Sequence, residues 1–176
     1  MKDLIYQRIN ESINTKKRLL DDSNIHAQIE DISRRILKSL ETGGKVIFAG
    51  NGGSFADSQH LSAEFVSRFL FNRPALASVA LGTNSSNMSA IGNDYGYEDV
   101  FSRELEAIGN ANDVFIGIST SGSSPNIISA INASKKIGMH AIALTGSKDC
   151  ELWNLVESIK IPSTETARIQ ECHITV

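Results

Sequence analysis

KVIFAGNGGSFADSQHLSAE, residues 45–64, places an apolar run, a glycine turn and a helix-forming segment one after another. Gly50, Gly52 and Gly53 carry no Cβ, so the backbone can turn sharply there and approach a ligand closely. Ser54 is expected to cap the following helix, whose free N–H groups and positive dipole end favour an anion. An apolar strand that leads through such a turn into a helix is typical of the first unit of an α/β fold.

His60 and Glu64 are four residues apart and project from one face of that predicted helix. They form either a metal-binding or acid–base pair beside the turn, or an ordinary surface ion pair. Their place after the carboxyl end of the first strand favours a functional pair, because ligands of open α/β sheets gather there. Two nucleotide sites are excluded, since GNGGS lacks the G-x-G-x-x-G spacing and no Gly-Lys-Ser/Thr follows it.

From residue 45 onward, the chain alternates between short apolar runs and helical patterns. Strands rich in Val and Ile are predicted at residues 45–49, 77–81, 113–119, 140–145 and 158–161. Helices are predicted between them at residues 54–70, 85–92, 98–108, 125–137 and 151–155. This alternation predicts a single α/β domain over residues 1–176, with a doubly wound, five-stranded parallel sheet that has helices on both faces.

Two further helices are predicted before the first strand, within residues 3–42, with a break near residues 21–24. Leu4, Ile5, Ile9 and Ile13 recur at helical spacing and give the first helix an apolar stripe. That stripe either packs against another copy of the chain or folds back on its own domain, and the pattern favours neither arrangement.

The composition is that of an ordinary globular protein, and the formal net charge is −3. That charge gives no electrostatic reason to expect binding to nucleic acid or to an anionic membrane, so local dipoles must hold any anionic ligand. No apolar run approaches the roughly 20 residues that span a bilayer, and the N-terminus has no secretory signal pattern. With only Cys150 and Cys172, no disulfide framework is expected. We therefore expect a cytoplasmic protein with no nucleic-acid or membrane partner.

A second candidate site is ISTSGSSPN, residues 118–126, directly after the predicted central strand. Four serines and a threonine surround Gly122, and Pro125 is expected at the first position of the next helix. Hydroxyls and backbone N–H groups at such a strand-to-helix turn form a neutral phosphate cradle that needs no Lys or Arg. An ordinary serine-rich turn is the alternative, but the density of hydroxyl groups favours the cradle.

Two weaker candidate sites lie further along the chain. Asn93 and Asp94, in IGNDYGYEDVFSRE (91–104), either contact ligand hydroxyls from a loop or simply form a turn. Gln170 and His173 share a face of a helix that opens residues 166–176, where surface polar residues are the simpler interpretation. The pattern of this helix still runs at Val176 without a C-cap, so either a short helix ends there or the sequence stops within a longer one.

Four ordered segments closely resemble the sedoheptulose 7-phosphate isomerases, or phosphoheptose isomerases, of the sugar isomerase (SIS) superfamily. The segments are GNGGSFADSQHLSAEFVSRF, AIGNDYGYEDVFSRE, GISTSGSSPNI and PSTETARIQECHI, and the resemblance covers nearly the whole chain. It implies a flavodoxin-like sheet and a homotetramer with active sites between subunits, in which residues 1–42 serve oligomer packing. It also implies that sedoheptulose 7-phosphate and D-glycero-D-manno-heptose 7-phosphate are interconverted, the first step toward the heptose of lipopolysaccharide or related glycans.

The same resemblance assigns residues to the site. The zinc-site and catalytic motif of the family falls on His60, Glu64 and Gln170, with one zinc ion per subunit and Glu64 as an acid/base group. Moving a carbonyl between C1 and C2 requires such a base and a stabilised cis-enediolate, so this chemistry agrees with the residues. The positions that contact the phosphosugar substrate are Asn51, Gly52, Gly53, Ser54, Glu64, Asn93, Asp94, Ser119, Thr120, Ser121, Ser124 and Gln170.

The chain departs from the family pattern in two places. The family has a further histidine two helical turns after Gln170, as zinc ligand and acid/base partner, and the sequence stops before that position. His173 lies only one turn from Gln170, so about 7 Å along the helix axis would separate it from the expected place. We therefore expect a truncated last helix rather than a substitute ligand. The second departure is GTNSSNMSA, residues 82–90, which lacks the Thr-Thr-Asp-Thr run of the family.

The main alternative is a non-catalytic SIS paralogue that resembles the isomerases but regulates replication initiation by binding the initiator protein. That group lacks the catalytic glutamate, whereas this chain has Glu64, together with Asp57 and Asp94. A phosphosugar sensor domain of the kind attached to transcription regulators is a third possibility, but no DNA-binding segment accompanies this domain. The residues therefore favour the isomerase.

Overall fold

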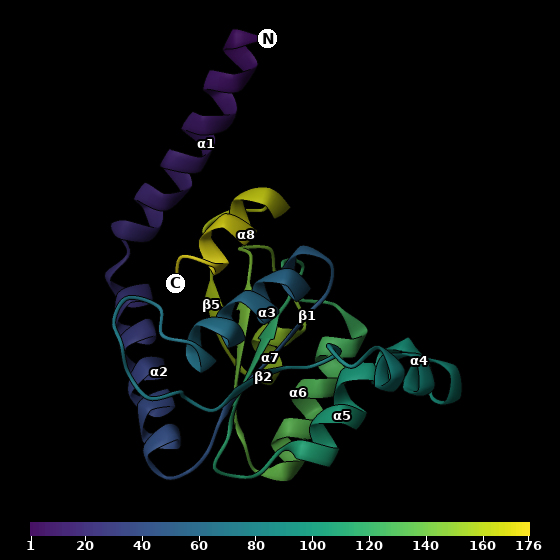
Figure 1. Cartoon of the computed structure of the whole chain (residues 1–176). Coiled ribbons are helices and arrows are strands. Elements are labelled where there is room, and N and C mark those ends of the chain that lie inside the picture. Colours follow the sequence, from purple (N-terminus) through teal and green to yellow (C-terminus); the bar gives the residue numbers. More distant parts are fainter.

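A five-stranded sheet lies between two layers of helices in the computed structural model of the chain, which describes residues 1–176 (Figure 1). The strand order is β2-β1-β3-β4-β5, and every neighbouring pair is parallel. This is the doubly wound order of flavodoxin-like folds, so the predicted fold class is confirmed. The strands are β1 (Val46–Gly50), β2 (Ser78–Ala80), β3 (Val114–Ile118), β4 (His140–Thr145) and β5 (Glu157–Lys160).

Helices precede the sheet and connect its strands at the places that the sequence predicts. The first two helices part at Asp22, whose carboxylate accepts hydrogen bonds from the N–H groups of Asn24 and Ile25 and so caps the second helix. No helix has both the length and the apolar character needed to cross a membrane. The helices are α1 (Lys2–Leu20), α2 (Ser23–Glu41), α3 (Gly53–Val66), α4 (Ser85–Asp94), α5 (Val100–Ile108), α6 (Pro125–Ile137), α7 (Leu152–Leu155) and α8 (Thr166–His173), with the 3-10 helix η1 (Tyr97–Asp99).

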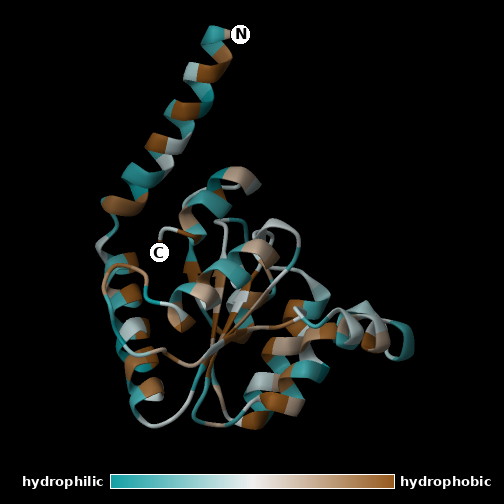
Figure 2. Ribbon diagram, in the orientation of Figure 1, coloured by the Kyte–Doolittle hydropathy of each residue, from teal (hydrophilic) through white to brown (hydrophobic).

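The sheet has two apolar faces, because successive side chains of a strand point to opposite sides. In β1, Ile47 and Ala49 enter a core shared with α5, α6 and α7, whereas Val46 and Phe48 enter a core shared with α2, α3 and α8. The five residues of β1 and of β3 are all buried, as expected for strands covered on both faces. Apolar residues accordingly concentrate along the strands and on the inner faces of the helices (Figure 2).

Helix α3 ends earlier than the sequence pattern predicts, at Val66 instead of residue 70. Arg73 decides this end, because its guanidinium donates hydrogen bonds to the carbonyl oxygens of Glu64 at 2.7 Å and Phe65 at 2.9 Å. The last carbonyls of a helix need such partners, and a distant side chain here supplies them. The apolar residues Phe69, Leu70 and Phe71 therefore leave the helix and lie exposed on the surface.

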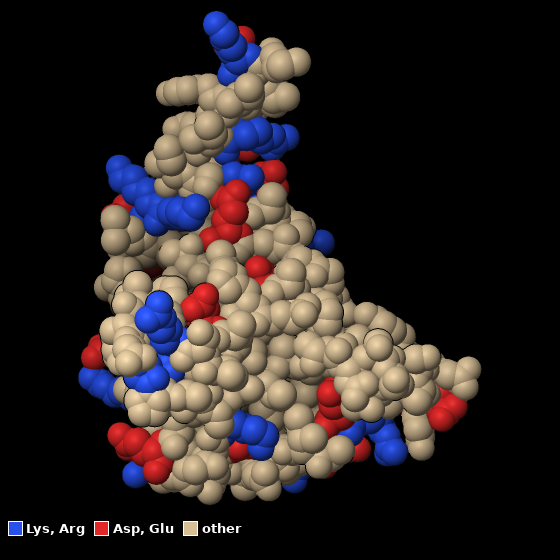
Figure 3. Space-filling view, viewed as in Figure 1, with Lys and Arg blue, Asp and Glu red and all other residues tan.

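Helix α1 extends away from the globular body, and its outer part touches little of the sheet (Figure 1). Leu4, Ile5, Ile9 and Ile13 are each 55–57% exposed, so the predicted apolar stripe does not fold back on the domain. Lys and Arg side chains lie mainly along α1 and at the margins of the face drawn in Figure 3, whereas the centre of this face is largely uncharged. The stripe is thus an exposed surface of this chain.

Candidate active site

The turn between β1 and α3 is closely packed and requires its glycines. A Cβ on Gly50 would lie 2.3 Å from the carbonyl oxygen of Ser54, and Gly52 has a φ of 56° that favours glycine. Gly52 is the N-cap of α3, and Ser54 is already the second helical residue, 3% exposed. The prediction that Ser54 caps the helix is therefore wrong, because the chain enters the helical conformation two residues earlier.

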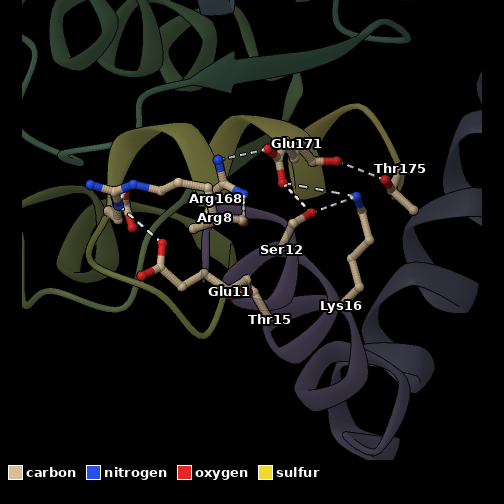
Figure 4. A network of polar contacts seen from close by, with 9 residues as sticks. Arg8, Glu11, Ser12, Thr15, Lys16, Arg168, Glu171 and Thr175 are labelled. Atoms are coloured by element: carbon tan, nitrogen blue, oxygen red, sulfur yellow. Dashed lines mark hydrogen bonds and ion pairs between the residues drawn. The ribbon is translucent and has the colours of Figure 1, made fainter. Parts of the chain in front are cut away.

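Gln170 is brought against this turn by α8. A Cβ on Gly53 would lie 2.5 Å from the Nε2 atom of Gln170, so the carboxamide packs directly on the first residue of α3. Helix α8 is in turn held by α1 through a network of polar contacts (Figure 4). In that network Ser12 donates to Glu171 at 2.6 Å, and Arg168 donates to the carbonyl oxygen of Arg8 at 3.0 Å. The position of Gln170 thus depends on tertiary contacts of both helices.

The serine loop, residues 119–124, leaves the carboxyl end of β3 and leads into α6. Ser119, which is 3% exposed, lies 2.9 Å from the hydroxyl of Ser124, and its Oγ accepts the N–H of Gly122 at 3.1 Å. Ser124 is the N-cap of α6 and Pro125 its first residue, as predicted. The hydroxyls therefore gather at a helix N-terminus, where the dipole favours an anion.

Two amide side chains join the glycine turn to the serine loop. Asn51 Nδ2 donates to Asn126 Oδ1 at 2.8 Å, and Asn126 Nδ2 donates to Asn51 Oδ1 at 2.9 Å. Tyr97 of η1 also donates to Asn51 Oδ1, at 3.2 Å. The two loops can meet because β1 and β3 are neighbours in register, with Gly50 beside Ile118. The structure therefore makes one site of the two segments that the sequence indicated separately.

Lys148 lies on the outer side of the serine loop. It lines a cavity of about 210 Å³ together with Thr120, Ser121, Thr164 and Thr166. A lysine at this place adds a positive charge beside hydroxyl groups that were predicted to act without one. The sequence carried no signal for it, because residues 147–149 belong to the connection after β4.

His60 and Glu64 form the predicted pair on α3, with 3.3 Å between His60 Nε2 and Glu64 Oε1. The imidazole is 60% exposed and the carboxylate 37% exposed, so both are accessible to a ligand. They line the edge of an apolar cavity of about 380 Å³, which is also bounded by Phe69, Phe71 and Val176. An exposed pair of this kind contributes little to stability, which leaves both groups available for chemistry.

The glycine turn and the His60–Glu64 pair lie at different levels of α3. Counted from Gly53, His60 is about 10 Å and Glu64 about 16 Å along the helix axis, at 1.5 Å per residue. Side chains lean back toward the N-terminus of their helix, which shortens the gap. A single ligand that reaches both the glycine turn and Glu64 must therefore be extended.

Asp57 occupies the face of α3 between these two levels. Its Oδ2 atom is buried and has no hydrogen-bond partner. Burial raises the pKa of the Asp57 carboxyl above its usual value, and the nearby charge of His60 acts in the opposite direction.

His173 does not belong to this site. The side chain is 1% exposed, and its Nε2 lies 3.2 Å from the carbonyl oxygen of Thr145, to which it donates. Burial lowers the pKa of His173 to about 4, so the imidazole is neutral at physiological pH. The interpretation of His173 as a surface polar residue is wrong, because α8 turns this face toward the sheet, and the ring cannot replace an exposed ligand.

Asn93 and Asp94 are the last two residues of α4, and not loop residues as predicted. The Nδ2 of Asn93 donates to Asp94 Oδ1 at 2.8 Å, and both side chains are exposed. Within residues 91–104, Tyr97 is the residue that contacts the glycine turn. Within residues 118–126, Asn126 at the start of α6 does so. Neither was predicted as a site residue, although both stand within the two segments that the sequence singled out.

The predicted metal ligands are brought together only in part. His60 and Glu64 lie side by side, whereas Gln170 contacts Gly53, about 10 Å from His60 along α3. No group of three or more His, Cys, Asp or Glu side chains in residues 1–176 could hold a metal ion. An imidazole and a carboxylate in contact nevertheless fit zinc in donor type, and their exposure leaves room for further ligands.

Sequence comparison relates the chain to one group of proteins. The SIS domain family matches residues 9–146. A phosphoheptose isomerase of Aneurinibacillus thermoaerophilus is 49% identical over 177 residues, which cover 100% of this chain and 89% of that protein. Phosphoheptose isomerase 2 of Campylobacter jejuni is 48% identical over 167 residues, which cover 94% and 83% of the two chains.

Solved structures agree with the sequence comparison. A phosphoheptose isomerase from Francisella tularensis matches with a TM-score of 0.92 at 33% identity, over 98% of this chain and 92% of that chain. The phosphoheptose isomerase GmhA from Neisseria gonorrhoeae matches with a TM-score of 0.89 at 38% identity, over 99% and 92% of the two chains. The similarity therefore extends over the glycine turn, the serine loop and α8 alike.

Proposed function

The chain belongs to the phosphoheptose isomerases of the SIS domain family, and we propose that it interconverts sedoheptulose 7-phosphate and D-glycero-D-manno-heptose 7-phosphate. The observation that carries this proposal is the meeting of two loops at neighbouring strand ends, with Glu64 on the helix that begins at one of them. The relatives support the isomerase and not the non-catalytic paralogue, and Glu64, which distinguishes the two, is present and accessible.

In this proposal the phosphate binds at the serine loop. Ser119, Thr120, Ser121 and Ser124 donate hydrogen bonds, together with the N–H of Asn126, which is the first in α6 because Pro125 has none. Asn51, Gly52, Gly53 and Ser54 contact the substrate from the glycine turn, and Gln170 does so from α8. The spacing along α3 favours an open-chain sugar phosphate whose phosphate lies at the end remote from its carbonyl group. Asn93 and Asp94 complete the proposed sugar contacts.

Glu64 is the proposed base. It takes a proton from C1 of the ketose, the electrons of that C–H bond form the C1–C2 double bond, and the oxygen on C2 takes up a proton. The resulting enediol loses the proton of its O1 hydroxyl as Glu64 returns a proton to C2, which gives the aldose. Donors fixed around the two oxygens lower the barrier by stabilising the charge of the cis-enediolate.

We also propose that His60 and Glu64 bind a zinc ion, with Gln170 as a further ligand. The support is the contact between the imidazole and the carboxylate and their exposure. A zinc ion bound there would polarise the oxygens of the substrate and order its protein ligands. Binding of zinc by the wild-type protein and by His60→Ala, measured by elemental analysis after dialysis, tests this assignment. Equal zinc content in both would exclude His60 as a ligand.

The exposed stripe of α1 supports the proposed homotetramer. Leu4, Ile5, Ile9 and Ile13 would lie buried between subunits, since an apolar stripe of this size is costly to leave in water. Cys150 and Cys172 are both free and buried, which agrees with a reducing cytoplasm. The aldose product would supply the heptose of lipopolysaccharide or a related glycan.

The test of the proposed function is a direct assay. The protein is incubated with sedoheptulose 7-phosphate, with and without added zinc, and the aldose 7-phosphate is separated from the ketose and quantified. We expect approach to the same ketose–aldose equilibrium from either side. Absence of the aldose under both conditions, at enzyme concentrations comparable to the substrate, would refute the proposal.

A further inference from the structure

The reciprocal amide pair of Asn51 and Asn126 is a tertiary link between two loops that are 75 residues apart in sequence. Asn51 is the first residue after β1, and Asn126 is the second residue of α6. Asn126 is 3% exposed, whereas Asn51 is half-buried. The amide pair therefore joins the buried side chain of Asn126 to the partly exposed side chain of Asn51 at the edge of the candidate site.

Counting hydrogen-bonding groups shows what this link leaves free. A carboxamide has two N–H donors and an oxygen with two lone pairs. The Oδ1 of Asn51 accepts from Asn126 Nδ2 at 2.9 Å and from Tyr97 at 3.2 Å, which uses both lone pairs. Its Nδ2 donates once, to Asn126 Oδ1 at 2.8 Å. The one group that remains on Asn51 is a single N–H donor, and its direction is set by the three bonds.

We propose that Asn126 and Tyr97 are positioning residues that hold the free N–H of Asn51 toward a hydroxyl oxygen of the substrate and fix the spacing of the two loops. This inference rests on the proposed function, in which the glycine turn and the serine loop bind one phosphosugar. Neither positioning residue needs to touch the substrate. Tyr97 reaches Asn51 from η1 and closes the arrangement from a third element.

Asn126→Asp distinguishes a positioning role from a packing role. The two side chains have nearly the same shape, so the variant keeps the packing and changes only the hydrogen bonds to Asn51. When ionised, the introduced carboxylate could accept from Asn51 Nδ2, but it would set a second oxygen against Asn51 Oδ1. A protonated carboxyl restores the reciprocal pair, since its O–H donates to that oxygen. Burial raises the pKa of such a carboxyl, so the change falls within a range where the enzyme can be assayed.

We expect Asn126→Asp to lower kcat/KM by about 10-fold or more at pH 8, on the scale of one or two lost hydrogen bonds. The ratio of variant to wild-type kcat/KM should then rise as the pH is lowered, whereas the ratio for Asn126→Leu should stay low throughout. Tyr97, Asp99, Lys148 and Cys150 are the titratable groups facing the first turns of α6 and the serine loop. They are shared with the wild type, so dividing by its profile removes their contribution.

Tyr97→Phe provides a second variant that keeps the fold, because the ring is 60% exposed. It removes one bond to Asn51, and we expect kcat/KM to fall about 3- to 10-fold with an unchanged melting temperature. Tyr95→Phe is the matched control, since Tyr95 is 56% exposed and its hydroxyl contacts Arg103 instead. Tyr95→Phe should retain wild-type kcat/KM.

The outcomes separate the two proposals. If the wild type forms no aldose, the proposed function fails and the positioning role fails with it. If the wild type is active but Tyr97→Phe matches Tyr95→Phe, or the Asn126→Asp ratio is independent of pH, the positioning role is wrong and the function stands.

Discussion

The two halves of the candidate site are built in opposite ways. The loop half, made of the glycine turn and the serine loop, is held by partly buried hydrogen bonds, and Ser119 and Asn126 are each 3% exposed. The helix half, His60 and Glu64 on α3, has one contact at 3.3 Å between side chains that are 60% and 37% exposed. The groups proposed for substrate binding are thus preorganised by this chain, whereas His60 and Glu64 stay open to ligands.

The largest effect should come from the helix half. Glu64→Gln keeps the shape of the side chain and removes the base, so we expect kcat to fall on the order of 10³-fold. Binding of sedoheptulose 7-phosphate, measured by calorimetry, should change little, because the loop half is intact. Glu106→Gln, an exposed glutamate on α5, is the control and should keep full activity. Near-wild-type turnover of Glu64→Gln would show that Glu64 is not the base. The helix half would then not be the part of the site that transfers protons.

The loop half should respond in stability as well as in binding. A Cβ on Gly122 would lie 2.1 Å from the Sγ of Cys150, and its φ of 66° adds strain, so Gly122→Ala should lower the free energy of unfolding by roughly 2–4 kcal/mol. Gly43→Ala is the control, because φ is also positive, at 82°, but no atom lies within 4 Å of the added Cβ. Urea denaturation of both variants measures the difference, and equal losses would contradict tight packing of the serine loop.

Helix α8 places Gln170 against the loop half and His173 in the core. The burial of His173 should make the stability of the protein depend on pH under acidic conditions. The pKa of His173 is lowered from its ordinary value of 6.5 to about 4 in the folded chain. Between pH 6.5 and pH 4, the unfolded chain therefore binds a proton on this histidine that the folded chain does not bind. Stability from this residue is complete above pH 6.5 and declines as the pH falls toward 4, by up to roughly 3 kcal/mol.

His173→Gln removes that dependence. The difference in the free energy of unfolding between wild type and His173→Gln should shrink as the pH falls from 7 to 4, measured by urea denaturation. His26→Gln, a change at an exposed histidine, should keep the wild-type slope. A constant difference between the wild type and His173→Gln would show that His173 is not a buried neutral group.

Among the changes that compare the two halves, single hydroxyls of the serine loop should have the smallest effect. Ser119→Ala removes contacts to Ser124 and to the N–H of Gly122, so KM should rise about 10-fold while kcat stays near the wild-type value. Ser123→Ala is the control, because that exposed hydroxyl has only a long contact of 3.5 Å to the carbonyl oxygen of Ser121. A fall in kcat without a change in KM would show that Ser119 acts in the chemical step and not in substrate binding.

Local patterns predicted the elements of the fold but not all of their ends. Alternating apolar runs and helical periodicity placed every strand and the turn glycines, because these signals are contained in neighbouring residues. The end of α3 was missed, since Arg73 stops it from outside the helix. Asn93 and Asp94 were expected in a loop because their sequence also suits a turn, whereas α4 continues through them.

The residue types of the candidate site could be predicted from the sequence, whereas the hydrogen bonds that join its segments could not. Glycines and serines after two strands indicated a phosphate cradle, and His60 with Glu64 indicated an accessible pair. Asn126 and Tyr97 were overlooked, although each stands within a segment already singled out, because a buried asparagine and an exposed tyrosine carry no signal of their own. Their importance lies in one shared partner, Asn51.

The sequence by itself determined the fold class and the residue types that stand at the carboxyl ends of the strands, because hydropathy period and turn residues act over a few neighbouring positions. Only the tertiary structure decided that Gln170 packs on Gly53, that His173 is buried, and that Asn126 pairs with Asn51. These are contacts between segments far apart along the chain. Their geometry depends on how the parallel strands and their helices pack, which no local pattern encodes.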